Sequence, residues 1–393
     1  MIKPVELESL IVRQEGFPFF SRELIAERQL ELLNFQLRRA KSKSGFYRDY
    51  PDSLSSLEEL SSIPFTTAEN VRADFSRLCL VSPDEFARLR TELTSGTSGP
   101  PKRMAYSHYD CMRTLAFFEN GLGELVFPGD RVLICMPFTD SLSLGGLIAE
   151  AIRRLGARPV IAGVGKSFGE YINTCISDNA NVYIGPSVLL LSLLRLSPLP
   201  LKRALVSGDH CAQSVRLACE AALGSRLFPH YGLRESGLGC ALTCSAHEGL
   251  HVRENDIICE IISESGTPLP VGQWGELVIT TIGMDAMPLF RYRTGDFARI
   301  LPGVCPCGSS VLRIEVTDRI QNGIGIGFYD ELLFGFDEIV DFSISGRNIV
   351  ISVTDENENL KQSLSKVLRS FSVSFRRALL TDTPMYISKR RIL

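Results

Sequence analysis

The hydrophobic positions between about residues 130 and 300 fall into short apolar runs that alternate with amphipathic stretches. Residues 131–136 and 158–162 are apolar runs of strand length, and residues 142–156 between them repeat apolar positions at helical spacing. Two further apolar runs follow at residues 181–185 and 203–207. Strands that alternate with helices of about ten to fifteen residues are typical of an α/β fold with a largely parallel sheet.

The rest of the chain predicts other arrangements. Apolar residues from Leu30 to Leu37 predict an amphipathic helix, and Thr67 is placed to cap a second helix. After Gly249, closely spaced apolar runs separated by Gly and Pro predict antiparallel strands. From Asp318 the pattern is two strands, a helix and a final strand. We therefore expect a large N-terminal α/β domain with an antiparallel β subdomain over residues 1–317, and a small α+β domain over residues 318–393.

Composition excludes several classes of protein. The 393 residues carry 42 Lys and Arg against 45 Asp and Glu, so the basic excess that nucleic acids or anionic membranes attract is missing. No apolar run reaches the roughly 18 residues of a membrane span, and an acidic N-terminus does not resemble a signal peptide. Eleven cysteines, an odd number in a chain of this size, favour reduced thiols and a cytoplasmic location.

The segment from Thr94 to Lys102, TSGTSGPPK, has the chemistry of a polyphosphate-binding loop. Two glycines leave backbone N–H groups unobstructed, four hydroxyl side chains add donors, and a lysine closes the loop. The spacing differs from that of the Walker loop and from that of a hydrolase nucleophile elbow. A flexible surface loop is the alternative interpretation.

Three further segments occur in a fixed order after this loop. They are LVSGDH at residues 205–210, HYGLRE at 230–235 and RYRTGD at 291–296. Together with the loop they resemble the adenylate-forming superfamily of acyl-CoA synthetases, and within it the phenylacetate–CoA ligase branch. The resemblance covers nearly the whole chain and implies activation of a carboxylic acid by ATP, followed by transfer to CoA.

The resemblance also implies roles for individual residues. Tyr231 would stack on adenine and Asp296 would accept the ribose hydroxyls with help from Arg319. Glu235 would hold Mg²⁺, and Lys389 near the chain end would neutralise the α-phosphate when the small C-terminal domain, acting as a lid, moves over the site. Thr97, Glu235 and Lys389 would be the catalytic residues. The other residues implied in ATP binding are Ser95, Gly96, Ser98, Gly99, Lys102, Ser207, Gly208, Asp209 and Gly232.

The acyl substrate is less defined by the sequence. Aryl or aryl-acetic acids are favoured because the resemblance points to them, and Phe138, Gly145 and His230 are the candidate pocket residues. The glycine pattern around Gly145 serves helix packing equally well. His108 is expected at a strand end, as a packed surface histidine. Dimers are common in this branch, so a homodimer is one expected state.

Other interpretations stay open at this point. Arg234 stands where the family usually has a hydroxyl residue, the hinge after Asp318 departs from the usual acidic pair, and the C-terminal domain is short. Arg234 and the altered hinge slightly favour a catalytically silent nucleotide-binding relative. The intact phosphate loop, Glu235, Asp296 and Lys389 argue against it. A third possibility is an adenylate-forming enzyme that delivers its acyl group to an amine, a partner protein or a reductase.

Cysteine and histidine spacing predicts a structural zinc site. Cys244 and His251 are separated by six residues, and Cys305-Pro-Cys307-Gly follows some 55 residues later. Three thiolates and one imidazole are a set that tetrahedral structural zinc accepts, and relatives in this branch look similar. The alternative is that the cysteines are small buried apolar residues and the histidine lies on the surface.

Overall fold

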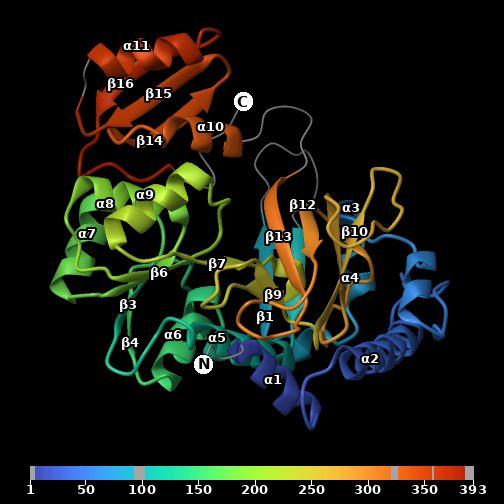
Figure 1. Cartoon of the computed structure of the whole chain (residues 1–393). Coiled ribbons are helices and arrows are strands. Elements are labelled where there is room, and N and C mark those ends of the chain that lie inside the picture. Colours follow the sequence, from blue (N-terminus) through green and yellow to red (C-terminus); the bar gives the residue numbers. More distant parts are fainter. Residues whose placement is uncertain (1–4, 93–101, 320–325, 356–357, 386–393) are drawn as a thin grey trace. The chain divides into compact units, whose positions relative to one another are not determined.

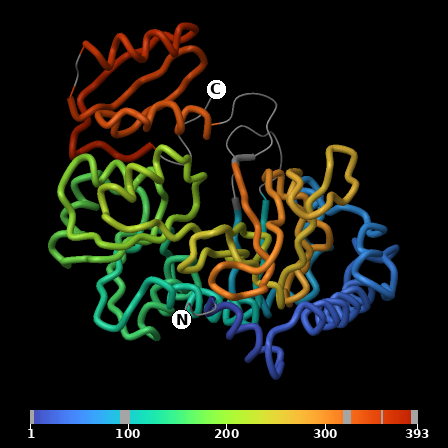
Figure 2. Tube along the Cα trace, viewed as in Figure 1, coloured from blue at the N-terminus to red at the C-terminus, as the bar shows by residue number. Residues whose placement is uncertain are grey.

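The computed structural model describes residues 5–92, 102–319, 326–355 and 358–385 (Figure 2). The chain forms two compact units. The first unit is Met1–Glu124 with His230–Ile320, and the second unit is Leu125–Pro229 with Gln321–Leu393. Within the described residues, no helix combines the length and the apolar character needed to cross a membrane.

Parallel strands form the sheet of the second unit, in the order β7-β6-β5-β3-β4 (Figure 1). Pro159 lies in β4, the edge strand of the sheet. Proline has no backbone N–H, and an edge strand tolerates it because no further strand pairs with its open side. The alternation predicted from the sequence is confirmed. Strands β3, β4 and β6 end one or two residues earlier than expected, and β5 begins one residue later. The elements are β3 (Arg131–Ile134), α6 (Leu144–Arg154), β4 (Arg158–Ile161), α7 (Phe168–Ser177), β5 (Val182–Gly185), α8 (Ser187–Leu196), β6 (Arg203–Val206), α9 (Gln213–Leu223) and β7 (Phe228–Tyr231), which leads into the first unit.

The C-terminal part of the second unit has the predicted strands and helix, preceded by a further helix, α10, that was not predicted from the sequence. In its three-stranded sheet, β15 pairs antiparallel with β14 and parallel with β16. The elements are α10 (Ile326–Leu333), β14 (Ile339–Ser345), β15 (Asn348–Val353), α11 (Glu358–Val367) and β16 (Ser372–Arg377).

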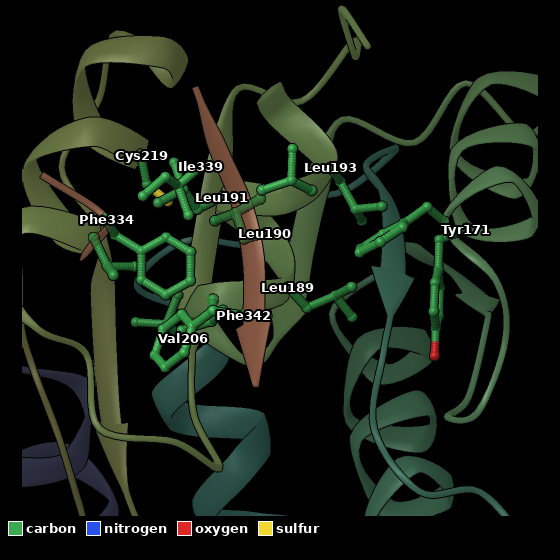
Figure 3. Close-up of a cluster of buried hydrophobic side chains, with 14 of the residues drawn as sticks. Tyr171, Leu189, Leu190, Leu191, Leu193, Val206, Cys219, Phe334, Ile339 and Phe342 are labelled. Carbon is green, nitrogen blue, oxygen red and sulfur yellow. The ribbon is translucent and has the colours of Figure 1, made fainter. Parts of the chain in front are cut away.

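Apolar side chains join this C-terminal part to α8 and α9 in one continuous core (Figure 3). We call this contact the apolar junction. Each of its residues that we name is at most 1% exposed, and burial of such side chains is the main stabilising force in a protein interior. The residues are Leu189, Leu190 and Leu193 of α8, Cys219 of α9, and Phe334, Ile339 and Phe342.

Two polar side chains of α8, at the edge of the apolar junction, donate hydrogen bonds to backbone carbonyls of the C-terminal part. Ser192 donates to the carbonyl of Val340 on the edge strand β14 at 2.6 Å, and the Arg195 guanidinium donates to the carbonyls of Phe334 and Ile339. At the start of α7, the N–H of Gly169 donates to the carbonyl of Leu380 at 2.7 Å. A carbonyl on the open side of an edge strand has no partner in its own sheet, and the N–H groups of a first helical turn have none in their own helix. The bonds from Ser192 and from Gly169 supply these missing partners.

The first unit contains the N-terminal helices, one hairpin and the antiparallel strands. In the hairpin β1–β2, Glu92 is paired with Lys102, so the predicted phosphate loop is the connection between the two strands. The predicted antiparallel strands are confirmed, and they follow the order β10-β11-β12-β13-β9-β8. The elements are α1 (Glu6–Glu15), α2 (Arg22–Lys43), α3 (Ala68–Ala73), α4 (Phe75–Leu78), β1 (Arg88–Glu92), β2 (Lys102–Tyr106), α5 (His108–Leu122), β8 (Ala241–Leu242), β9 (Leu250–Val252), β10 (Ile257–Ile262), β11 (Gly275–Thr281), β12 (Tyr292–Leu301) and β13 (Arg313–Arg319).

Helix α5 corrects one expectation, because His108 is its first residue and does not end a strand. Ser107 caps the helix by accepting the N–H of Asp110, whose carboxylate accepts the N–H of Ser107 in return. This reciprocal pair is a capping box, and its Ser-x-x-Asp spacing is visible in the sequence. The same device begins α3, where Thr67 caps the helix as predicted.

Candidate functional site

Glu235 is the central acidic group of the candidate site. It lies in a single turn of 3₁₀ helix, Arg234–Ser236, and its side chain is 3% exposed. Its Oε1 lies 2.5 Å from Nζ of Lys102, the last residue of the phosphate-loop motif, and accepts the Tyr292 hydroxyl at 2.8 Å. The fold therefore brings together a cation and an acid from motifs 133 residues apart in the sequence.

The charge state of Glu235 follows from these contacts. Burial alone would raise the pKa of Glu235, but the Lys102 ammonium and the Tyr292 hydroxyl outweigh it and hold the pKa below its ordinary value. The carboxylate is therefore ionised at neutral pH. An ionised, buried carboxylate is a suitable hard ligand for a divalent cation.

Tyr231 and Asp296 form a second polar pair in the first unit. The Tyr231 hydroxyl donates to Oδ2 of Asp296 at 2.6 Å. Asp296 lies where the register of β12 shifts, next to Gly295 with a φ of +74°. A bulge of this kind redirects a side chain out of the regular ladder, which is a common device at sites. Burial and the charge of Asp296 raise the pKa of Tyr231, so the hydroxyl stays protonated and donates.

His230 precedes this tyrosine and packs against two aromatic rings that also contact each other. Its ring centroid lies 5.8 Å from that of Phe117 and 5.7 Å from that of Phe118, both on α5. Burial, helped by the charge of Arg253, lowers the pKa of His230 to about 4, so the imidazole is neutral at physiological pH. A Cβ on Gly232 would lie 2.3 Å from the carbonyl of Leu238, so close backbone approach explains that glycine.

Ser207, Gly208 and Asp209 lie at the carboxyl end of β6 in the second unit. Ser207 is nearly buried, and Gly208 has a φ of +91°, which favours glycine. The Asp209 carboxylate accepts the N–H groups of Ser187 and Val188 at 2.8 and 3.0 Å. Asp209 thus has a structural task at the N-terminus of α8 in addition to the ATP contact that we predicted.

The predicted acyl-pocket residues Phe138 and Gly145 also lie in the second unit. Phe138 is 41% exposed. A Cβ on Gly145 would lie 2.9 Å from the carbonyl of Pro137 and 3.3 Å from Cβ of Phe138, so this glycine allows α6 to pack closely on the preceding turn. That contact supports the packing explanation for Gly145, and its role in a pocket stays a prediction.

Several predicted site residues lie outside the described structure. The backbone of Arg319 pairs with Asp296 across β12 and β13, whereas its side chain is not among the described atoms. The remaining residues of this group, which stay predictions, are Ser95, Gly96, Thr97, Ser98, Gly99 and Lys389.

The four predicted zinc ligands come together in the first unit. Their ligand atoms lie within 4.8 Å of one another, and all four residues are buried. Sγ of Cys244 is 3.7 Å from Sγ of Cys305, and Sγ of Cys307 is 3.7 Å from Nε2 of His251. Zinc–sulfur bonds of about 2.3 Å place the sulfurs of a tetrahedral site about 3.8 Å apart, so the four residues fit a tetrahedral ion.

Some residues that support the site were missed in the sequence. Tyr292 lies inside the RYRTGD motif, so the motif itself was a signal for it. Tyr106, Thr114 and Arg253 donate to backbone carbonyls next to Glu235. They carry no local sequence signal, because each bond joins residues that are far apart in the chain and that only the fold brings together.

Comparison with known proteins agrees with the geometry. Residues 81–285, more than half of the chain, match the family of AMP-binding enzymes. The chain is 29% identical to the phenylacetate-coenzyme A ligase of Pseudomonas putida, over 72% of this chain and 68% of that protein. It is 30% identical to the phenylacetate-coenzyme A ligase of Aromatoleum evansii, over 76% of this chain and 71% of that protein.

A solved structure supports the fold. The crystal structure of 2-hydroxyisobutyryl-CoA ligase in its postadenylation state matches with a TM-score of 0.79 at 17% identity, covering 93% of this chain and 88% of that one. This likeness concerns the fold alone, whereas the family match and the curated relatives concern the sequence. The chain therefore belongs to the family of AMP-binding enzymes, in its phenylacetate–CoA ligase-like branch.

Proposed function

We propose that the chain is an AMP-forming acid–CoA ligase that activates an aryl or aryl-acetic acid. The observation that carries the proposal is the cluster of Lys102, Glu235 and Tyr292, in which the lysine of the phosphate loop meets a buried ionised acid. The curated relatives are phenylacetate-coenzyme A ligases, which favours an aryl-acetic substrate.

The reaction has two steps. A carboxylate oxygen attacks the α-phosphorus of ATP, the bond to the β-phosphate breaks, and pyrophosphate leaves an acyl-adenylate. The CoA thiol then attacks the acyl carbon and loses its proton, and AMP departs with the bonding electrons. In the first step Asp296 would hold the ribose and Lys102 the phosphates, so that binding energy fixes the reacting atoms in line.

Glu235 is the residue that we assign to Mg²⁺. The ion, when bound, supplies charge neutralisation to the triphosphate. The carboxylate is ionised, buried and already faces one cation, which suits a hard divalent ion. Lys102 would then move its contact from the acid to the phosphates.

Pyrophosphate release with ATP, Mg²⁺ and a panel of carboxylic acids tests the function. We expect release with aryl or aryl-acetic acids and thioester formation when CoA is added. Glu235→Gln should abolish release, whereas Glu260→Gln, which removes a carboxylate paired with Arg291, should retain it. Release without transfer to CoA would indicate another acceptor, and no release with any acid would indicate a silent nucleotide-binding relative.

We also propose that Cys244, His251, Cys305 and Cys307 hold one structural zinc ion. The four residues come from the turn after β8, from β9 and from the turn after β12, so the ion would tie these turns together. None of the eleven cysteines, all of which lie among the described residues, forms a disulfide, which supports a reducing compartment such as the cytoplasm.

Elemental analysis of the purified protein should find one zinc per chain. Cys305→Ser should lower both zinc content and thermal stability, because metal binding and folding are coupled. Cys111→Ser is the matched control, since Cys111 is equally buried at 3% and lies outside the four-residue cluster. Zinc-free protein with the stability of the wild type would contradict the assignment.

A further inference from the structure

The turn that carries Glu235 is short and is followed by a residue with an unfavourable backbone conformation. It is three residues long, and the two residues that follow, Gly237 and Leu238, have φ values of +71° and +74°. The left-handed region is unfavourable for a leucine, so Leu238 is strained. Strain of this kind persists only where the surroundings enforce it.

Three side chains hold the backbone of this turn. The Tyr106 hydroxyl of β2 donates to the carbonyl of Arg234 at 2.9 Å, and Nη2 of Arg253 donates to the carbonyl of Ser236 at 3.0 Å. The Thr114 hydroxyl of α5 donates to the carbonyl of Gly237 at 2.7 Å. We call these three donors the carbonyl clamp. The peptide unit before Glu235 and the two peptide units that follow Ser236 are therefore held by side chains from β2, from α5 and from the segment after β9.

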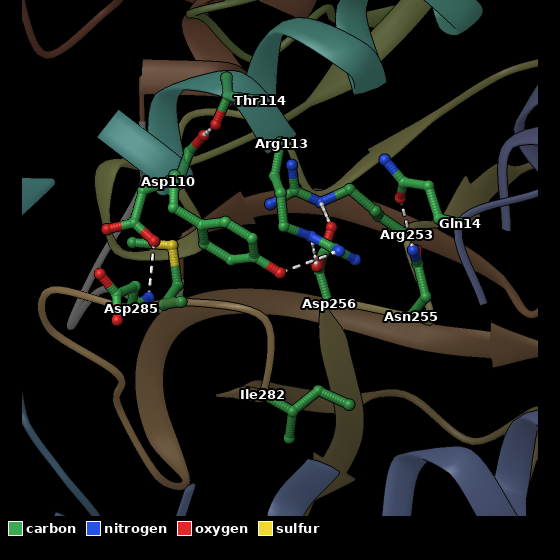
Figure 4. Close-up of polar contacts among 12 residues, drawn as sticks. Gln14, Asp110, Arg113, Thr114, Arg253, Asn255, Asp256, Ile282 and Asp285 are labelled. Atoms are coloured by element: carbon green, nitrogen blue, oxygen red, sulfur yellow. Dashed lines mark hydrogen bonds and ion pairs between the residues drawn. The ribbon is translucent and has the colours of Figure 1, made fainter. Parts of the chain in front are cut away.

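Arg253 is itself fixed by a buried charge network (Figure 4). Its Nε lies 3.0 Å from Oδ2 of Asp256, whose Oδ1 lies 2.5 Å from Nε of Arg113. The guanidinium also lies 5.2 Å from the centroid of the Phe117 ring. With 2% of its surface exposed, Arg253 has little freedom to turn away from Ser236.

We propose that Tyr106, Thr114 and Arg253 are positioning residues that orient the Glu235 carboxylate toward the metal ion of bound ATP. This inference rests on the proposed function, in which Glu235 is a Mg²⁺ ligand. A rotation of the peptide unit before Glu235, or a shift of Ser236 and Gly237 after it, would turn the Cα–Cβ bond of Glu235 and move its carboxylate. Mg²⁺ demands near-ideal octahedral geometry, so small misplacement of an oxygen weakens binding.

Deletion of single donors tests the carbonyl clamp. Tyr106→Phe and Thr114→Val each remove one hydroxyl with little change of shape. We measure ATP binding by titration calorimetry over a range of Mg²⁺ concentrations, which needs no knowledge of the acid. Each variant should raise the half-saturating Mg²⁺ concentration by about 3- to 10-fold, the value of one hydrogen bond. Arg253→Met should raise the half-saturating Mg²⁺ concentration as well, and Arg253→Lys should raise it less, because a lysine can still donate a hydrogen bond.

Tyr47→Phe is the matched control for Tyr106→Phe. The buried Tyr47 hydroxyl also donates to a backbone carbonyl, that of Pro288, at 2.8 Å. This variant should lower the melting temperature and leave the Mg²⁺ dependence of ATP binding unchanged. If Tyr106→Phe and Thr114→Val behave like Tyr47→Phe, the clamp is a structural feature only and the inference is overturned.

Two outcomes separate this inference from the proposed function. ATP binding by Glu235→Gln that keeps the wild-type Mg²⁺ dependence would remove the metal role of Glu235, and the clamp proposal with it. A shifted dependence in Glu235→Gln together with normal dependence in the clamp variants would overturn the clamp alone. Should Arg253→Met fail to fold, because Asp256 would lose a buried partner, the tyrosine and threonine variants still decide.

Discussion

The turn of Glu235 in the first unit and the apolar junction in the second unit achieve a fixed geometry by different means. Around Glu235, directional bonds from Tyr106, Thr114 and Arg253 reach individual carbonyls. At the apolar junction, non-directional burial of residues such as Phe342 dominates, and the hydrogen bonds of Ser192 and Arg195 are additions. We therefore expect the orientation of the turn to be sensitive to single hydrogen bonds, and the stability of the apolar junction to be sensitive to buried apolar area.

The largest expected effect concerns the apolar junction. Phe342→Ala removes a ring that is 1% exposed and should lower the free energy of unfolding of the second unit by about 3–5 kcal/mol. Urea unfolding measures it. Phe328→Ala, at a residue of α10 that is 53% exposed, should change the stability little. Equal losses in both variants would contradict the role given to burial.

Acid should destabilise the first unit through His230. Its pKa in the folded protein is about 4, below the ordinary 6.5, so between these values the unfolded state binds a proton that the folded state does not. Stability should therefore fall by about 2 kcal/mol from pH 7 to pH 5. His230→Phe should flatten this dependence in urea titrations, whereas His108→Gln, at an exposed residue, should retain it.

The polar pair of Tyr231 and Asp296 should govern ATP binding more than stability. Asp296→Asn should weaken ATP binding by about 10- to 100-fold, since a charge-assisted hydrogen bond contributes about 1.5–3 kcal/mol. Calorimetric titration with ATP and Mg²⁺ checks it. Asp285→Asn removes a partly buried partner of Arg39 in the same unit and should leave ATP affinity as it is. Unchanged affinity in Asp296→Asn would remove Asp296 from the nucleotide site.

A smaller effect is expected for the hydrogen bonds of the apolar junction. Ser192→Ala leaves the carbonyl of Val340 without this donor and should lower the free energy of unfolding by about 0.5–1.5 kcal/mol. Ser365→Ala, an exposed helical serine that donates within α11, is the control and should have no measurable effect. A loss as large as that of Phe342→Ala would mean that hydrogen bonds dominate this region too.

No loss of activity is expected from a covalent link across the start of α7. A Cβ on Gly169 would lie 3.3 Å from Cβ of Leu380, near the roughly 3.5–4.5 Å of a disulfide. The oxidised Gly169→Cys/Leu380→Cys enzyme should retain both half-reactions, because separating the apolar junction would expose its buried side chains. Loss of thioester formation that a reductant restores would show instead that the C-terminal part leaves α7 during turnover, as expected of a lid.

Sequence reasoning succeeded where a pattern repeats locally. The parallel strands, the antiparallel region and the small C-terminal α+β part follow from spacing that neighbouring residues share. It failed at α5, where the capping box of Ser107 and Asp110 was present and His108 was nevertheless assigned to a strand end. It also gave Asp209 only a nucleotide contact, whereas the structure places its carboxylate on the N-terminus of α8.

The amino-acid sequence by itself determined the alternating strands and helices, the antiparallel region, the motifs of an adenylate-forming enzyme and the four residues of the Cys/His cluster. These depend on residue type and spacing, which a linear chain displays. Only the tertiary structure decided that Lys102 meets Glu235. It also decided that Tyr106, Thr114 and Arg253 donate hydrogen bonds to the turn that carries Glu235. Such contacts depend on how distant elements pack, and no local preference of Tyr, Thr or Arg encodes which distant carbonyl the side chain will reach.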